Sequence, residues 1–365
     1  EPIDLVEEVL RLEGYDSIPA ELPKAPAGRG LTREQRLRRR LGRAVADAGW
    51  VELSSYPFIS PADLDALQLP ADDPRRDALA LANPVSEHDS HLRTTLLPAL
   101  LAALARNVGR GEPDVGLYEI GAAYLPAAER PVAPRVPATA RPSEDELAAL
   151  EAALPAQPLR FAAAVTGRRE LAGHWGPGRA ADWSDVVELA RLACRTLGAP
   201  PPVVTAATGA PFHPGRCAQI AVGGVVVGRA GELHPRAIAA TGVPARTCVV
   251  ELDLAPVFAA AVDVVPAPAL SLYPAATVDL ALVVPAGTAA ATVEEALRSG
   301  AGRLLEDVRL FDVYRGAQVA PDHVSLAYTL TLRDTERTLT DDDVLVARTA
   351  ALAAAAAATG AALRS

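Results

Sequence analysis

Three carboxylates near the start of the chain have a spacing that could hold a metal ion. Asp4, Glu7 and Glu8 fall within residues 2–13, whose periodicity predicts an amphipathic helix ended by Gly14. Positions i, i+3 and i+4 of a helix share one face, so the three carboxylates would project together. Crowded oxygen ligands suit a hard cation such as Mg²⁺, which usually keeps several waters. The plainer alternative is a solvated acidic face.

A second set of candidates combines positive charge with an aromatic ring. Its members lie near the C-terminal end of the chain: Tyr314, Arg315, Arg333 and Arg337. An arginine can contact phosphate in bidentate geometry and stack on bases, and tyrosine offers a stacking face. The four are therefore candidate RNA contacts. For each of them, a solvent-facing or structural role is the alternative.

Charge restricts what an RNA contact here can be. The chain has a formal net charge of −10, whereas nucleic-acid affinity comes largely from neutralised phosphates. Residues 266–365 carry 8 Arg against 12 Asp plus Glu, a balance of −4. Any RNA contact must therefore be a small local patch. Lys24 is the only lysine, so nearly all positive charge is arginine.

The elements that must position these C-terminal residues follow an alternating order. Apolar or alternating runs predict four strands, at residues 278–284, 308–314, 325–332 and 361–363. We expect one helix to open near Thr292 with a capping-box-like start, and another at Thr340, followed by three aspartates that suit the positive end of a helix dipole. Gly360 should end the second helix. Strand, helix, strand, strand, helix, strand is the ferredoxin-like split βαβ order.

The long middle part predicts an antiparallel sheet with flanking helices, so the fold class is α+β. The expected strands are residues 115–118, 161–165 and 249–254, with a hairpin over 217–230 that turns at Gly223 and Gly224. The expected helices include residues 183–197 and, inside a surface insertion at 126–158, residues 143–154. Residues 20–30 are rich in Pro and Gly and predict a linker.

One helix in this part has a strongly basic face. Thr32 and Gln35 form a capping box, and an apolar stripe through Leu37 and Leu41 predicts a helix that runs to Gly49. Its other face holds five arginines: Arg36, Arg38, Arg39, Arg40 and Arg43. This pattern indicates an interface helix or a phosphate-contacting one, with a solvated arginine face as the alternative. Replacing both leucines by Asp should harm folding or assembly.

Two histidines could suggest a metal or acid/base site. His213, and His234 with Glu232, lie near turns, but their spacing matches no ligand pattern such as His-Glu-x-x-His. A single histidine near a turn is more often a loop anchor. We expect that role for both.

Three separated blocks near the C-terminus carry a resemblance to a known family. They are residues 310–316 (LFDVYRG), 325–328 (SLAY) and 337–341 (RTLTD). Together they resemble the ferredoxin-fold anticodon-binding domain that ends the β-subunit of bacterial phenylalanyl-tRNA synthetase. The match is specific because the three blocks occur in order at suitable spacing.

The resemblance extends over nearly the whole chain and is weakest at about residues 126–160. Residues 4–8 (DLVEE), 14–16 and 18–19 look like the end of that subunit's winged-helix-like domain. Blocks similar to its synthetase-like core are residues 56–58 (YPF), 83–84 (NP), 92–98 (LRTTLLP), 117–121 (LYEIG), 213–216 (HPGR) and 231–235 (GELHP). The implied domains are a winged-helix end at 1–24, a class II synthetase-like core at 25–265 and the anticodon-binding domain at 266–365.

In this family the core resembles a catalytic domain while the α-subunit performs activation, with ATP, and transfer. An active class II site needs one arginine on the α-phosphate of ATP and a second near the nucleotide. Arg93 could serve as the first, but no convincing Gly-rich helix carries the second. The resemblance therefore implies no catalytic residue in this chain.

The resemblance also implies partners. It implies an α-subunit, an α₂β₂ assembly and tRNA(Phe), with the anticodon stem-loop contacted by Tyr314, Arg315, Arg333 and Arg337. Basic pairs that the family often has are replaced here by Thr277-Val278 and His323-Val324. Losing up to four positive charges predicts weaker or differently placed RNA contact.

A magnesium site shared with the α-subunit is implied as well. Its acidic ligands match Asp4, Glu7 and Glu8, and a further family aspartate falls six positions before Asp4, outside this chain. The site is therefore expected to be incomplete here.

Composition excludes several classes of protein. No apolar stretch reaches the ~18–20 uninterrupted residues that a membrane helix needs, and nothing resembles a secretion signal. Cys194, Cys217 and Cys248 lie far apart without metal spacing, which favours buried thiols in a reducing cytoplasm. Neither a membrane nor DNA is an expected partner.

The chain begins inside a recognisable domain, so we expect a fragment of a longer polypeptide. The family's N-terminal half contains a tRNA-binding module and an editing site, and neither is recognisable here. One alternative is a stand-alone RNA-binding or assembly module, which the acidic balance favours. Another is independent hydrolytic or ligase chemistry near His213 and His234, which turnover without a partner would favour.

Overall fold

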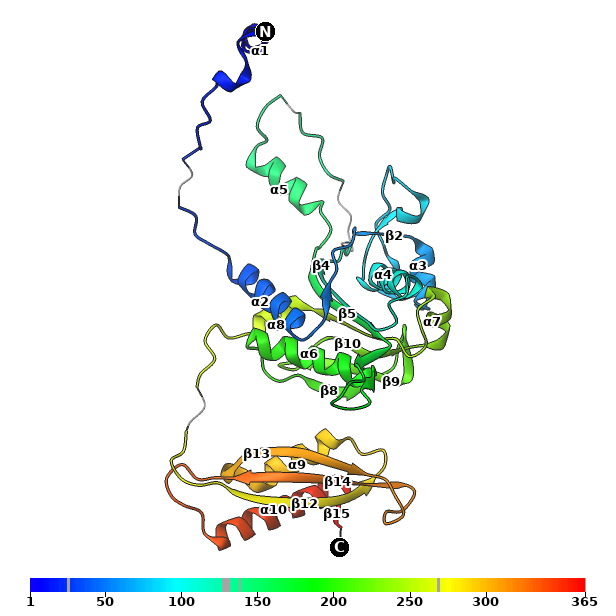
Figure 1. Cartoon of the computed structure of the whole chain (residues 1–365), viewed down its shortest axis with the longest axis vertical. Helices are drawn as coiled ribbons and strands as arrows, with labels where there is room; N and C mark the ends of the chain where they lie inside the picture. Colours follow the sequence, from blue (N-terminus) through cyan, green and yellow to red (C-terminus); the bar gives the residue numbers. More distant parts are fainter. Residues whose placement is uncertain (25–26, 127–131, 138, 268–269, 365) are drawn as a thin grey trace. The chain divides into compact units, whose positions relative to one another are not determined.

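A seven-stranded sheet forms the centre of the first part of the chain (Figure 1). The computed structural model describes residues 1–24, 27–126, 132–137, 139–267 and 270–364. The chain divides into two units, Glu1–Val265 and Pro266–Ser365. The predicted separation of residues 1–24 from the rest of the first unit stays a prediction.

The strand order of this sheet is β1-β4-β5-β11-β10-β9-β8. The strands are β1 (Val51–Glu52), β4 (Val115–Ala122), β5 (Leu159–Thr166), β8 (Val203–Ala206), β9 (Phe212–Val222), β10 (Val225–Leu233) and β11 (Cys248–Asp253). Neighbours pair antiparallel, as predicted, except that β1 pairs parallel with β4. The sheet is therefore mixed. The parallel strand was not predicted, because two residues are too few to show a period in the sequence. Two further pairs are β2 (Phe58–Ile59) with β3 (His91–Leu92) and β6 (Arg168–Glu170) with β7 (Arg179–Ala180).

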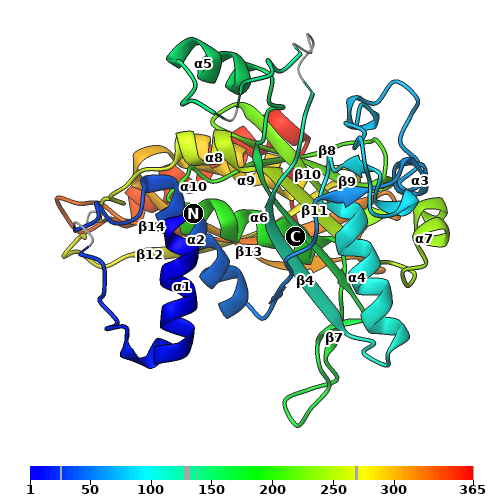
Figure 2. The same cartoon turned by 90° about the horizontal axis from the view of Figure 1, so that it is seen from above.

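Helices pack on both faces of this sheet. The helices of the first unit are α1 (Pro2–Glu13), α2 (Arg33–Asp47), α3 (Pro61–Ala66), α4 (Leu97–Gly109), α5 (Glu144–Ala152), α6 (Trp183–Leu197), α7 (Pro235–Thr241) and α8 (Leu254–Ala260). Alternation along β5 sends Phe161 and Ala163 into the core with α2, α6 and α8, and Ala162 and Ala164 into the core with α3 and α4. Figure 2 shows α4 running beside β4.

Local sequence signals explain where these elements begin and end. The side chain of Asp182 caps α6, and Gly198 ends that helix in the left-handed conformation, at the bounds predicted from the sequence. The hairpin between β9 and β10 turns at Gly223 and Gly224, whose φ angles are 57° and 82°. The predicted helix of the surface insertion is present as α5. Residues 127–131 and 138 of the insertion, and 25–26 of the predicted linker, lie outside the described residues.

The second unit is a four-stranded antiparallel sheet with two helices. Its elements are β12 (Ala276–Pro285), α9 (Ala290–Ala301), β13 (Leu305–Tyr314), β14 (His323–Leu332), α10 (Asp341–Thr359) and β15 (Ala362–Leu363), and the strand order is β13-β14-β12-β15. Both helices share a core with one face of the sheet, around Leu297, Tyr328 and Ala351. This arrangement confirms the ferredoxin-like prediction. A Cβ at Gly300 would lie 2.6 Å from the carbonyl oxygen of Ala350, so the close crossing of α9 and α10 needs glycine there.

Two helix starts in this unit had been predicted, and one prediction is wrong. Thr340 caps α10, with its hydroxyl oxygen accepting from the backbone N–H of Asp343. In contrast, α9 begins at Ala290 without a side-chain cap, so Thr292 lies inside its first turn. Val293 and Leu297 of this helix are buried in the core with the sheet, so packing stabilises α9 without a capping box.

The cysteines are buried free thiols, as predicted. Burial raises the pKa of the Cys194 thiol to about 11 and that of Cys248 to about 12. No helix within the described ranges is both long enough and apolar enough to span a bilayer.

Candidate functional site

The four candidate RNA contacts do not form one patch. Strands β13 and β14 are antiparallel, with Tyr314 opposite Ser325 at one end and Leu305 opposite Leu332 at the other. Tyr314 and Arg315 therefore lie at the first end, and Arg333, which follows Leu332, at the second. Seven steps along β14, from Ser325 to Leu332 and about 24 Å, separate the two ends.

At the first end, which we call the Tyr314 end, the positive charge is largely free. Arg315 is exposed and makes no hydrogen bond or ion pair within the described part of the chain. The guanidinium of Arg364 lies over the Tyr314 ring, 4.5 Å from its centroid. Arg364 also donates to the side chain of Gln318. Acidic residues also lie near this end: Asp322, which pairs with His323 at 2.8 Å, and the exposed Asp312 of β13, two positions before Tyr314.

Arg364 was not among the sequence-predicted contacts. It follows β15, which pairs with β12 through Leu282 and Leu363, and its backbone N–H donates to the carbonyl oxygen of Ala281 at 2.8 Å. A terminal strand beside the first strand is implied by the split βαβ order. A residue just after such a strand is thus the signal that could have pointed to Arg364.

At the second end, the Arg337 end, the arginines are already paired. Arg333 donates from Nε to Glu306 at 2.7 Å and from Nη1 to the carbonyl oxygen of Tyr273 at 2.8 Å. Arg337 forms a bidentate pair with Asp343 at 2.7 and 2.8 Å. Donation by Arg337, with a cap contact from Thr340, holds the pKa of the Asp343 carboxyl well below its usual range. A phosphate at this end would have to compete with these carboxylates.

The predicted carboxylate set lies on α1, and all three side chains are exposed. Asp4 contacts the amino group of Glu1, and Glu8 pairs with Arg11 at 2.6 Å. Among the described residues, no group of three or more His, Cys, Asp or Glu side chains is arranged to hold a metal ion. As placed here, Asp4, Glu7 and Glu8 do not fit Mg²⁺ by themselves, and their assignment as ligands stays a prediction.

Helix α1 also exposes apolar side chains and buries none. The exposed ones are Ile3, Leu5, Val6, Val9 and Leu12. The helix is amphipathic, as predicted, but its apolar face has no partner among the described residues.

Arg93, the candidate ligand for a nucleotide phosphate, is instead a buried structural residue. It is 4% exposed and pairs with Glu119 at 2.8 Å. It also donates to Ser55 Oγ at 2.8 Å and to the carbonyl oxygen of Ala122 at 2.9 Å. A Cβ on Gly121 would lie 2.3 Å from this guanidinium. Arg93 therefore joins the segment after β1 to β4, and its Nε and Nη1 donors are used within the fold.

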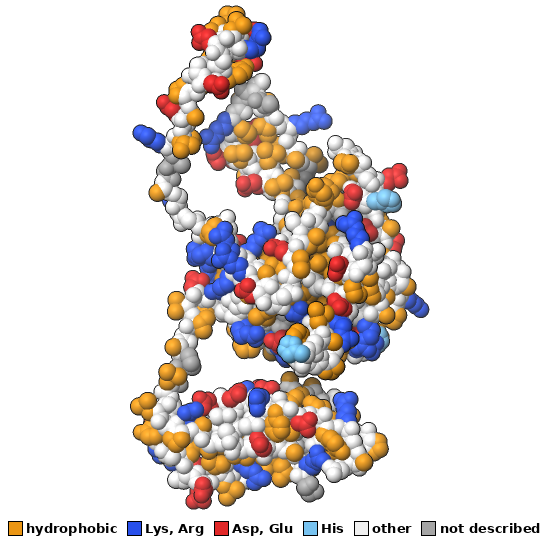
Figure 3. Space-filling view, viewed as in Figure 1, with side chains coloured by type: hydrophobic (Ala, Val, Ile, Leu, Met, Phe, Trp, Pro, Cys, Tyr) orange, Lys and Arg blue, Asp and Glu red, His pale blue; other side chains and the backbone are white. Residues whose placement is uncertain are grey.

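The outer face of α2 carries five arginines. Leu37 and Leu41 are buried against α6, so Asp at either position would disrupt this unit's own core rather than an interface. A shallow cavity of about 440 Å³ lies on the outer side of the helix, lined by Arg36, Arg39, Arg40, Arg43, Asp47 and neighbouring residues. Figure 3 shows Lys and Arg side chains gathered over α2. Arg36, Arg38 and Arg40 donate to the backbone carbonyl oxygens of Leu31, Ile120 and Leu197. Arg39 and Arg43 make no hydrogen bond or ion pair among the described residues, so these two arginines are the part of the face that is free for a partner.

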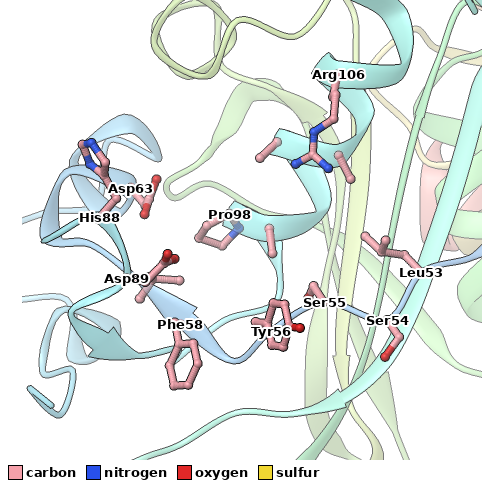
Figure 4. A pocket seen from close by; sticks show the side chains of 14 residues that line it. Leu53, Ser54, Ser55, Tyr56, Phe58, Asp63, His88, Asp89, Pro98 and Arg106 are labelled. Atoms are coloured by element: carbon pink, nitrogen blue, oxygen red, sulfur yellow. The ribbon is translucent and has the colours of Figure 1, made fainter. Parts of the chain in front are cut away.

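A second open cavity, of about 460 Å³, lies between the segment after β1 and α4 (Figure 4). The rings of Tyr56 and Phe58 stack at 6.4 Å, and Tyr56 is 83% exposed. Arg106 of α4 and Asp89 reach the rim. Asp63, also on the rim, is used by the capping box of Ser60. The cavity combines an aromatic wall with separated charges and has the character of a docking surface.

Both histidine candidates serve the backbone. His213 Nδ1 accepts from the N–H of Gly215 at 3.0 Å, and His234 Nδ1 caps α7 by accepting from the N–H of Arg236 at 3.1 Å. Glu232 pairs with Arg216 at 2.9 Å. These contacts are the loop anchors that the sequence analysis expected.

Comparison with known proteins gives the chain a family. Residues 18–254 match the model of the phenylalanyl tRNA synthetase beta chain CLM domain, and residues 271–364 match that of the ferredoxin-fold anticodon binding domain. Relatives named phenylalanine–tRNA ligase beta subunit from Streptomyces avermitilis and from Thermobifida fusca are each 52% identical over 100% of this chain. The chain spans 44% of the length of each of these curated relatives.

Among solved structures, pyrrolysyl-tRNA synthetase from Desulfitobacterium hafniense aligns at 14% identity with a TM-score of 0.41. That alignment covers 61% of this chain and 67% of the other, and it is too weak to argue from. The two domain matches, by contrast, span most of the sequence in the order that the fold shows. The chain belongs to the phenylalanyl-tRNA synthetase β-chain family.

Proposed function

We propose that this chain acts as the C-terminal portion of a phenylalanine–tRNA ligase β-subunit. It scaffolds a catalytic α-subunit and helps to hold tRNA(Phe) while that subunit attaches phenylalanine with ATP. The observation that carries this proposal is the pair of domain matches, which together span residues 18–254 and 271–364. The reaction is that of a ligase, and this chain contributes no catalytic residue to it.

The scaffold role is supported by how the first unit uses its polar groups. Arg93, the side chain that could have met a nucleotide, is held by Glu119 and Ser55. The arginine face of α2 and the cavity beside Tyr56 remain open. We assign the arginine face to the α-subunit, in an α₂β₂ assembly, because its basic charge can steer and orient a protein partner with an acidic surface.

The tRNA role is supported by the Tyr314 end. There an exposed arginine, a second arginine and a ring lie together: Arg315, Arg364 and Tyr314. Such a group can contact phosphate and stack on an unpaired base. Of the four predicted contacts, we keep Tyr314 and Arg315 as the primary ones and give Arg333 and Arg337 a lesser part.

Magnesium belongs to this proposal only as a shared site. Asp4, Glu7 and Glu8 would be three of its ligands, and the absent ligands would come from outside this chain. When bound, Mg²⁺ would join the β-subunit to its partner. The proposed place of action is the cytoplasm, where buried reduced thiols such as Cys194 are usual.

The alternative of a stand-alone RNA-binding module has no support from the relatives. The two compared here carry the same name and align with this chain over its whole length. Its remaining argument is the net negative charge of the chain. That charge is compatible with tRNA binding at the Tyr314 end, because the contact proposed there is a small local patch.

Co-expression of this chain with the α-subunit of the same organism, followed by native mass measurement, tests the proposal. We expect a stoichiometric complex. A folded chain, verified by circular dichroism, that stays alone even when the full-length β-subunit binds under the same conditions would contradict the scaffold role of these residues.

A further inference from the structure

A charged cavity of about 490 Å³ opens on one face of the first unit's sheet. Its floor is formed by Arg160 of β5, Arg229 of β10, and Glu251 and Asp253 of β11. Apolar atoms of Leu97, at the start of α4, line it as well. This cavity is separate from Arg93, from the α2 face and from the Tyr314 end, and none of the roles proposed above uses it.

Strand register places opposite charges side by side on this floor. Asp253 lies directly opposite Arg160, and Glu251 lies directly opposite Arg229. Directly opposite side chains of antiparallel strands are neighbours on the same face. The floor therefore presents two cationic and two anionic groups in two cross-strand pairs.

The two carboxylates are used in part by other groups. Glu251 accepts from the hydroxyl of Thr95 at 2.8 Å and from the backbone N–H of Leu96 at 2.8 Å. Asp253 caps α8 by accepting from the N–H of Ala255 at 3.1 Å. These contacts consume acceptor capacity that the arginines would otherwise use.

The two arginines, in contrast, keep unused donors. Arg229 is half-buried and makes no hydrogen bond or ion pair within the described ranges. The nearby carboxylate of Asp73 interacts with the charge of Arg229 but is itself paired with Arg75 at 2.7 Å. Arg160 approaches Glu251 only at 3.5 Å, and its buried Nε has no acceptor. A guanidinium presents five donors, and a buried donor without an acceptor is unfavourable. An oxyanion in the cavity would supply the acceptor that the fold leaves out.

We propose that this cavity binds a small molecule with one oxyanion group, a carboxylate or a phosphate, and an apolar portion. Arg229 is the main donor to the oxyanion, Arg160 assists, and the apolar portion lies against Leu97 and Phe212. The volume falls in the range of small-molecule sites, ~300–1,000 Å³. The site adds ligand binding to the proposed scaffold role and does not depend on tRNA or on the α-subunit.

Ligand-observed NMR titration of the 365-residue chain with three probes tests this site. Benzoate and inorganic phosphate represent the two oxyanions, and benzamide is an uncharged match for benzoate. We expect saturable binding of at least one anion, and affinity for benzamide about tenfold weaker than for benzoate if the ligand is a carboxylate. Saturation by phosphate alone would assign the site to phosphate compounds.

Substitutions then locate the binding. Arg229→Gln should lower the affinity for the anion about tenfold or more. Arg229→Lys, which keeps the charge but loses the planar guanidinium, should lower this affinity less. Arg236→Gln removes an exposed arginine of α7 outside the cavity and should change nothing. The absence of saturable binding by either anion to the folded chain would overturn the proposal. So would equal affinities of the wild-type chain and a folded Arg229 variant.

Discussion

The two ends of the C-terminal sheet carry the same kind of residue in opposite states. At the Arg337 end, Arg333 and Arg337 donate to Glu306 and Asp343. At the Tyr314 end, Arg315 has no carboxylate partner within the described residues. The difference teaches that, in this acidic chain, an arginine is a good candidate for contacting RNA only when the fold leaves it without a carboxylate partner. Arginine count alone does not identify the site.

Arg93 is a paired arginine that is also buried, and its replacement should have the largest effect on stability. Arg93→Gln would leave Glu119, also buried, without its cation, at a cost of roughly 3–5 kcal/mol in the free energy of unfolding. Urea unfolding of the variant measures this cost. The double variant Arg93→Gln, Glu119→Gln should recover a large share of it, and a single variant as stable as the wild type would show that the pair is dispensable.

The arginine face of α2 extends the comparison to unpaired arginines in the first unit. Arg39 and Arg43 are exposed, so Arg39→Glu with Arg43→Glu should leave the fold intact while weakening the α-subunit complex about tenfold or more. Circular dichroism and native mass measure the two outcomes separately. Arg236→Glu is the matched control on another exposed helix. Undiminished complex formation by the double variant would remove this face from the proposed interface.

Removing the carboxylate partner of Arg337 should make this arginine available to RNA, as Arg315 is at the Tyr314 end. Asp343→Asn removes the charge that holds Arg337 while keeping an oxygen that accepts from the backbone N–H of Thr340, so tRNA(Phe) affinity should rise about twofold to fivefold. Filter binding at fixed salt measures the change. Adding Arg337→Gln should cancel the gain, and a gain that persists in the double variant would mean that Arg337 is not its source.

The smallest expected effect is on the pH dependence of stability. Because the pKa of Asp343 is depressed in the folded state, chiefly by Arg337, its contribution is present above the unfolded pKa of about 4 and is lost as pH falls further. Arg337→Gln should therefore lower the melting temperature slightly at pH 7, with the difference closing towards pH 2. A difference that is constant across this range would point to lost packing instead.

Sequence patterns predicted the elements well because their signals are local. Asp182 and Gly198 bracket α6, and Thr340 starts α10, each through contacts within a few residues. The prediction at Thr292 failed because its capping-box-like pattern lies inside the first turn of α9, which begins at Ala290 without a side-chain cap. The parallel strand β1 was missed because two residues carry no periodicity.

The site was harder to predict because its decisive contacts are distant in sequence. Arg333 meets Tyr273, sixty positions away along the chain, and Arg93 meets Glu119 across two elements. The sequence does not show that these arginines have partners, whereas in the fold both are paired with carboxylates. Arg364 became part of the candidate site only through the pairing of β15 with β12.

The most direct test of the account is tRNA(Phe) affinity of the assembled α-subunit complex carrying either Arg315→Gln or Arg337→Gln, measured at one salt concentration. Each variant removes one positive charge from the same unit. We predict that Arg315→Gln weakens binding about fivefold or more and Arg337→Gln less than about twofold. An equal or larger loss for Arg337→Gln would contradict the claim that unpaired arginines at the Tyr314 end contact the tRNA.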